Sequence, residues 1–199
     1  MKLPGCNSLF KRFCAPWYEQ NAEQSHALGT TRGDLETRWK PGTRVDRVHR
    51  VSPGDWRAIV KKQISTMVRA ASSDWKRYLD IGSKVSLGWV EAFDAYYDRS
   101  RIRDLIERSD PKESDNEYHV VCIQFGVVLG TVLSQMIPRL RWLLDWPYWE
   151  SAPYDSKTGT RVNVFHWAVD KLSEDGVDDG FAVKLQVVAQ LLERELSER

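Results

Sequence analysis

Two short patterns in the sequence place groups that could bind a metal or act as acid and base. His166 and Asp170 lie four residues apart, so on a helix their side chains would share one face. His119 and Cys122 form a similar pair, three residues apart. A metal site needs further ligands in a recognisable relation, and neither pair has them. We therefore expect His166 to bond to backbone or to Asp170, and Cys122 to be an inert thiol in an apolar run.

Three acids near one another in sequence, Asp145, Glu150 and Asp155, could act as paired carboxylates. They lie beside an expected turn, where acids are usually solvated. The chain contains none of the patterns Gly-x-Ser-x-Gly, Gly-x-Gly-x-x-Gly, Gly-x-x-x-x-Gly-Lys or His-Glu-x-x-His. We expect no catalytic residue, no cofactor and no metal. An enzyme with an unrecognised site near His166 and Asp170 is the alternative, and stoichiometric metal that is lost on His166→Ala would favour it.

The composition is that of a soluble globular protein with a sizeable core. The chain has 199 residues, of which 42% are hydrophobic and 29% charged, and its net charge of +1 gives no global attraction to nucleic acid or to an anionic membrane. Three cysteines with no Cys-x-x-Cys spacing argue against a disulfide framework and a structural zinc site. With no signal-like apolar region at the N-terminus, we expect a cytoplasmic protein.

A long helix is predicted from Ser52 to about residue 80. The residues Ser-Pro-Gly-Asp at 52–55 have the pattern of a helix start, and apolar residues then recur at three- and four-residue steps. The opposite face is basic, which raises a second alternative, a nucleic-acid-binding protein that uses the basic face of 53–80. The helix's aromatic residues belong to the buried stripe and cannot stack on bases, so no nucleic-acid partner is expected. The basic residues are Arg57, Lys61, Lys62, Arg69, Lys76 and Arg77.

The uncharged run 120–137 is just long enough to cross a bilayer, and Gly126 and Gly130 have the GxxxG spacing of membrane helices. Polar residues interrupt the run, and a single span would leave the amphipathic stripes elsewhere without a partner. We therefore predict a buried central helix, not a membrane segment. The two glycines would let another element pack close to its backbone.

The residues that follow predict a small antiparallel sheet at about 139–165. Alternating apolar residues indicate a strand at 139–146 with one buried side, and further strands at 148–154 and 160–165 flank a turn at 155–159. Shorter helices are expected at 86–98 and around Ile102–Ile106, followed by one at about 165–172 and a final helix after Asp179. In the final helix, we expect a largely buried surface formed by Phe181, Leu185, Val188 and Leu192 and broadened by Val183, Val187 and Leu191.

Together these elements predict a helix-dominated α+β fold in a single domain, with the small sheet packed against the buried central helix. Residues 1–51 show no lasting periodicity and are expected to form an irregular arm docked on the body. The body, 52–199, would comprise a helical half at 52–108 and a helix-hairpin-helix-helix half at 118–196.

The aromatic hairpin is the predicted binding site. Pro147 and Pro153 should place it at an edge or bulge, where some of its rings turn outward. Exposed Trp and Tyr beside acids have the composition of a protein-binding hot spot. The predicted partner-binding residues are Asp145, Trp146, Tyr148, Trp149, Glu150, Tyr154 and Asp155.

The order IQFGVVLG, WPYWES, a turn with TG, and VFHWAVDKLSEDGVDDGF, between Tyr118 and Leu192, resembles that of small bacterial proteins of the toxin-immunity kind. Such proteins are the cytosolic partners that neutralise a toxin of type VI secretion or a similar competition system. The resemblance implies a non-catalytic protein that binds and occludes a toxin or effector, and does not identify that toxin.

Overall fold

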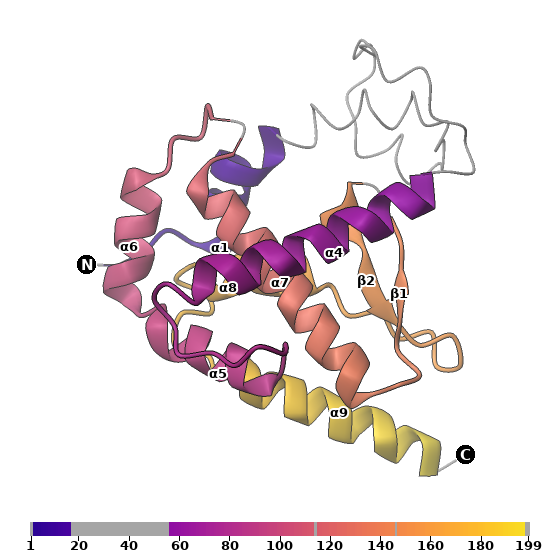
Figure 1. Cartoon of the computed structure of the whole chain (residues 1–199). Helices are drawn as coiled ribbons and strands as arrows, with labels where there is room; N and C mark the ends of the chain where they lie inside the picture. Colours follow the sequence, from indigo (N-terminus) through magenta and orange to yellow (C-terminus); the bar gives the residue numbers. More distant parts are fainter. Residues whose placement is uncertain (1, 17–55, 114, 146, 198–199) are drawn as a thin grey trace.

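The computed structural model describes residues 2–16, 56–113, 115–145 and 147–197 (Figure 1). Helices dominate the described chain and accompany a two-stranded sheet, which confirms the predicted α+β class. The helical elements are α1 (Cys6–Leu9), the π-helical turn η1 (Phe10–Cys14), α4 (Trp56–Trp75), α5 (Leu87–Tyr96), α6 (Arg99–Arg108), α7 (Glu117–Met136), the 3-10 turn η2 (Tyr148–Glu150), α8 (Val164–Lys171) and α9 (Phe181–Ser197). The strands are β1 (Arg141–Leu143) and β2 (Ala152–Tyr154).

Helix α7 is the centre of the fold. It begins at the N-cap Asn116, whose side chain accepts a hydrogen bond from the His119 N–H at 2.9 Å. It contacts α4, α5, α6, α8 and α9, and every residue from Val121 to Gly130 is buried. By length and composition α7 could cross a membrane, but 72% of its most apolar window is buried inside the protein. The predicted buried central helix is confirmed.

The two glycines of α7 permit the close packing that the sequence predicts. A Cβ atom at Gly126 would lie 3.1 Å from the Phe165 Cα, on the backbone of α8. At Gly130 it would lie 2.3 Å from the Trp142 ring, on β1. Side chains at these positions would push α8 and the sheet away from the central helix.

The first half of the body packs on α7 through α4, α5 and α6. The buried residues of α4 include Val60, Ile64 and Trp75, and the Trp75 indole N–H donates to the Gln124 Oε1 of α7 at 2.9 Å. The predicted helix start at 52–55 lies outside the described residues. Helices α5 and α6 fall where the sequence predicts them, and the Asp98 side chain caps α6 by accepting from the Arg101 N–H.

The sheet is smaller than the sequence predicts. Strands β1 and β2 pair antiparallel, with Trp142 opposite Pro153. Much of the expected second strand is the turn η2, which follows Pro147, and the expected third strand is reduced to one bridge between Tyr154 and Arg161. Proline lacks the N–H that a ladder needs, and α8 already begins at Val164, so neither strand can extend.

Helix α9 has two apolar faces, of which one is buried. Phe181, Leu185 and Leu192 pack into the core, and α9 contacts α5 and α7. The prediction that three further apolar residues broaden this buried face is wrong. Exposed fractions are 60% for Val183, 46% for Val187 and 53% for Leu191. In Figure 1, α9 lies along the lower edge of the molecule with the other described elements on one side of it.

The N-terminal residues 2–16 are helical in part, although the sequence predicts an irregular arm. Leu9 and Phe13 enter the core, and the Phe13 ring packs on Tyr118 at 4.8 Å between centroids. The backbone of the segment is held by the loop after α8, where the Leu3 N–H donates to Glu174 and the Cys6 N–H donates to Asp175. The rest of the predicted arm, 17–51, lies outside the described residues.

Candidate functional site

The structure places the predicted hairpin site mostly inside the protein. Exposed fractions are 6% for Trp149, 9% for Glu150 and 1% for Asp155. Asp145, Tyr148 and Tyr154 are half-buried, and Trp146 lies outside the described residues. Among the described hairpin aromatics, none is exposed: Trp149 is buried, and Trp142, Tyr148 and Tyr154 are half-buried.

Asp155 has a structural partner. Its carboxylate accepts a hydrogen bond from the Arg139 Nε at 2.7 Å and another from the Lys157 N–H at 2.9 Å. Burial alone would raise the pKa of Asp155, but these hydrogen bonds outweigh it and hold the pKa below the ordinary value. Arg139 also donates to the Leu192 carbonyl of α9, so the pair ties the hairpin turn to the last helix.

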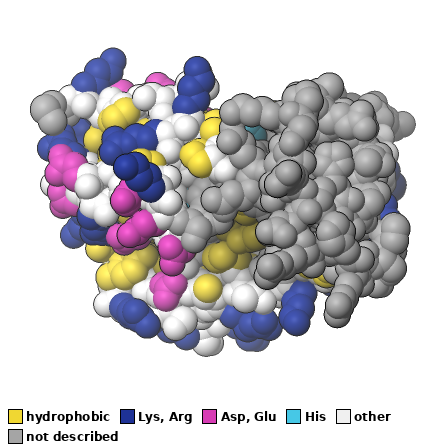
Figure 2. All heavy atoms as spheres, turned by 90° about the horizontal axis from the view of Figure 1, so that it is seen from above, with side chains coloured by type: hydrophobic (Ala, Val, Ile, Leu, Met, Phe, Trp, Pro, Cys, Tyr) yellow, Lys and Arg dark blue, Asp and Glu magenta, His cyan; other side chains and the backbone are white. Residues whose placement is uncertain are grey.

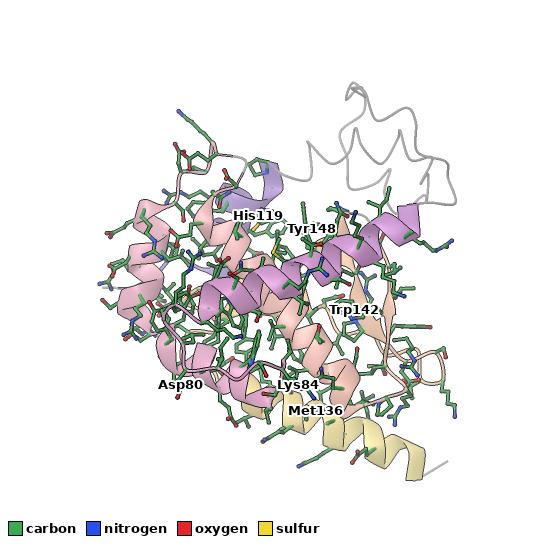
Figure 3. The ribbon with its side chains drawn as sticks, in the orientation of Figure 1. Asp80, Lys84, His119, Met136, Trp142 and Tyr148 are labelled. Carbon is green, nitrogen blue, oxygen red and sulfur yellow. The ribbon has the colours of Figure 1, made fainter. Side chains whose placement is uncertain are left out.

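The hairpin rings form a closed aromatic layer against α7 and α8. The Trp149 ring packs edge-on against His119 at 4.9 Å and against Tyr148 at 5.2 Å between centroids. Figure 3 shows His119, Tyr148 and Trp142 along α7 on the side of the sheet. The space that these rings enclose with Gly126 and Phe165 has no room for a water molecule. This layer is core and does not form a ligand pocket.

The His119–Cys122 pair is buried and chemically silent. Burial lowers the pKa of His119 to about 3, so the imidazole is neutral at neutral pH. Burial also raises the pKa of Cys122 well above its ordinary value, so the thiol is protonated. Both groups lie within α7, as the expectation of an inert buried thiol requires.

His166 lies beside Glu150 of the hairpin, at 3.8 Å between Nε2 and Oε1. Its side chain is half-exposed, and the Phe10 ring stacks on it at 6.0 Å between centroids. Asp170, the expected partner of His166, instead faces the Cys6 thiol, where burial and the nearby carboxylate raise the pKa of Cys6 to about 12. The structure therefore brings His166 together with one of the hairpin acids.

Metal ligation finds no support in the described part of the chain. No group of three or more His, Cys, Asp or Glu side chains there is placed to hold a metal ion. The pair of Glu150 and His166 supplies two donors, and a stable site needs more.

Among the described residues, the outer face of α9 carries a row of exposed large apolar side chains. Val183, Val187 and Leu191 follow one another at four-residue steps and form an exposed row. Gln186 and Gln190 beside them are exposed and uncharged. A solvated helix face normally carries charged side chains, whereas the centre of a protein interface is depleted of them. We call these five residues the α9 outer face.

Comparison with models of known protein families, with curated proteins and with solved structures finds no match.

The exposure of the α9 outer face can be predicted from the sequence. At 3.6 residues per turn, Val183 lies about 200° around the helix from Phe181, so both cannot face one core. The angle between residues around the helix therefore predicts which apolar side chains are exposed. A prediction that counts apolar residues without this angle overestimates the buried surface of the helix. The burial of Trp149 and Asp155 has no comparable signal, because it depends on the turn η2 and on Arg139, which is 16 residues from Asp155.

Proposed function

We propose that this protein is a non-catalytic binding protein of the toxin-immunity kind, which occludes a partner protein. The α9 outer face carries the proposal. Three large apolar side chains about half exposed in one row, with neutral glutamines on one side and Lys184, paired with Asp179, on the other, expose hydrophobic area to water. Burial of that area against a partner would stabilise a complex.

The proposed binding surface thus differs from the predicted one. Some surface is still exposed on the hairpin residues Asp145, Tyr148 and Tyr154. In contrast, Trp149, Glu150 and Asp155 are buried. Apolar anchors that must enter a partner's pocket need to be accessible in the free protein. The row on α9 meets that requirement and the hairpin rings do not.

The probe that tests this function is the purified protein encoded by the gene next to this one, because the proposed immunity function expects the toxin gene there. Titration with the wild-type protein should give a complex, and Val187→Glu should weaken it at least about tenfold, because a buried unpaired charge is costly. Ala95→Glu is the matched control, since Ala95 is exposed on α5, and it should bind as the wild type does. No complex with the wild type, or equal binding by Val187→Glu, contradicts the proposal.

A second copy of this chain is the competing occupant of the α9 outer face. Sedimentation of the wild-type protein alone distinguishes the two. We expect a monomer at micromolar concentration, since the proposed occupant of this face is a different protein. A dimer that Val187→Glu dissociates would assign the face to self-association.

The pair of Glu150 and His166 supports a second candidate, an enzyme that uses a carboxylate and an imidazole. A buried carboxylate 3.8 Å from a half-exposed imidazole can orient a general base. Metal analysis of the purified protein, with His166→Ala as the comparison, tests it. One bound metal ion per chain that is lost in the variant would favour this candidate over the binding protein.

A further inference from the structure

The apolar surface of α9 is wider than the face that the core covers. Measured from Phe181 at 3.6 residues per turn, Leu191 lies about 80° around the helix and Val187 about 120°, and both are exposed. The opposite edge of the buried face, about 80–100° in the other direction, is formed by the small residues Ala182 and Ala189. A roll of α9 about its own axis would therefore exchange two alanines for larger apolar side chains in the core. Hydrophobic burial alone does not fix the rotation of this helix.

A buried lysine lies beside the start of α9. Charged side chains normally lie at the surface of a soluble protein, and viewed from above the described surface on the left of Figure 2 carries basic and acidic side chains intermixed. Lys171, the last residue of α8, has a side chain that is only 3% exposed. Its ammonium group donates to the carbonyls of Val177 and Asp179, both at 3.1 Å, in the loop that precedes α9. The third N–H of the ammonium group is left for the Asp94 carboxylate, 3.4 Å away.

Asp94, on α5, connects this lysine to the first turn of α9. Its Oδ1 atom lies 3.4 Å from the Lys171 Nζ, and its Oδ2 atom accepts a hydrogen bond from the Ala182 N–H at 2.9 Å. The amides of a first helical turn have no partner within the helix, so a carboxylate from another element can cap them. In Figure 1 the start of α9 lies beside α5. The pair of Lys171 and Asp94 therefore joins α8, α5 and the first turn of α9.

A second polar contact reaches α9 further along the helix. Arg139 donates to the Leu192 carbonyl and pairs with Asp155 of the hairpin turn. Leu192 is buried, so this contact reaches α9 on its core-facing side. Hydrogen bonds depend on the direction of donor and acceptor, whereas burial of apolar area does not. The polar contacts therefore distinguish one rotation of α9 from the others.

We propose that Lys171 and Asp94 are positioning residues that set the rotation of α9 and thereby keep the α9 outer face exposed. The inference rests on the proposed function, which assigns that face to the partner. Apolar side chains of similar volume often replace a buried ion pair without loss of stability, so stability alone does not explain this pair. A buried polar group can instead select one of several packings that bury similar apolar area. The wide apolar surface of α9 makes such a selection necessary.

The test compares three backgrounds of the full chain. The first is the wild type, and the second, Lys171→Met/Asp94→Leu, is the pair variant. The control, Arg108→Met/Glu117→Leu, removes an ion pair between α6 and α7 whose side chains are about half exposed. Both variants lose one positive and one negative charge, so they differ in the place of the pair and in its burial.

Thiol labelling then measures which side of α9 faces water. Val187→Cys and Ala189→Cys are introduced separately into each background, because position 187 is exposed and position 189 is buried. Reaction with a maleimide, followed by peptide mass spectrometry, gives the labelling rate at each position. In the wild type and the control we expect position 187 to react at least about tenfold faster than position 189. In the pair variant this ratio should fall at least about fivefold, because α9 can roll.

The native Cys122, fully buried in α7, reports in the same experiment whether the core is folded. It should stay unlabelled in all three backgrounds. An unchanged ratio in the pair variant overturns the inference, and so do equal rates at the two positions in the wild type. Labelling of Cys122 in the pair variant overturns it as well, because the pair would then hold the whole fold and not the rotation of one helix. No partner takes part in the labelling, so a failure of the proposed function, seen as the lack of a complex, is a separate result.

Discussion

Gly130 lies where α7 meets the Trp142 ring, and its lack of a side chain allows that contact. Gly130→Ala should destabilise the protein by about 1–3 kcal/mol, because a Cβ atom 2.3 Å from the ring forces Trp142 out of its place. Urea unfolding measures the effect.

Gly88→Ala is the matched control. Gly88 lies in the helix α5, where a Cβ atom would meet only the Ser86 hydroxyl at 3.6 Å. The higher helix propensity of alanine should raise the free energy of unfolding there by up to about 1 kcal/mol. Equal stabilisation by both substitutions would show that Trp142 does not pack on Gly130.

His119 makes the stability depend on pH. Its pKa is about 3 in the folded protein and near 6.5 when unfolded, so between these values the unfolded chain binds more protons. The free energy of unfolding should therefore fall as the pH decreases from 7 to 4. The pKa of Asp155 is lowered from 3.8 in the folded protein, so Asp155 affects the free energy of unfolding mainly below pH 4.

The measurement is urea unfolding of the wild type and of His119→Gln at several pH values. The variant should show a shallower decline of the free energy of unfolding between pH 7 and 4, whatever its stability at pH 7. A wild-type slope in His119→Gln would mean that His119 is protonated in the folded protein.

At the scale of an element, the two apolar faces of α9 have different environments. One face packs in the core and the other is exposed. Leu185→Ala should cost about 2–5 kcal/mol of unfolding free energy, because Leu185 is fully buried in the core. Val187→Gln should change it by no more than about 0.5 kcal/mol, since that side chain is half-exposed. A large loss in Val187→Gln would mean that the α9 outer face has a structural role.

Helices were more predictable than strands for a physical reason. The stripes of α4 and α9 and the apolar run of α7 are local patterns, and their periods indicate helices directly. The sheet depends on pairing between distant residues, so Pro153 and the start of α8 decided its size. Burial of the hairpin depends on contacts between Trp149 and α7. No local sequence pattern indicates such contacts.

At the scale of the whole molecule, α7 organises the fold from the inside. It contacts α4, α5, α8 and α9, and 72% of its most apolar window is buried inside the protein. In fractionated cells the protein should remain in the aqueous supernatant before and after an alkaline carbonate wash. Retention of the protein in washed membranes would contradict the placement of α7 in a soluble core.

The central claim is that the α9 outer face contacts a partner protein, and a photo-crosslinker at position 187 tests it most directly. Benzoylphenylalanine replaces Val187 in one sample and the exposed Ala95 in the other, and each is irradiated with the purified product of the neighbouring gene. The account predicts a crosslinked heterodimer from position 187 and none from position 95. A complex that forms but crosslinks from neither position, or equally from both, would contradict it.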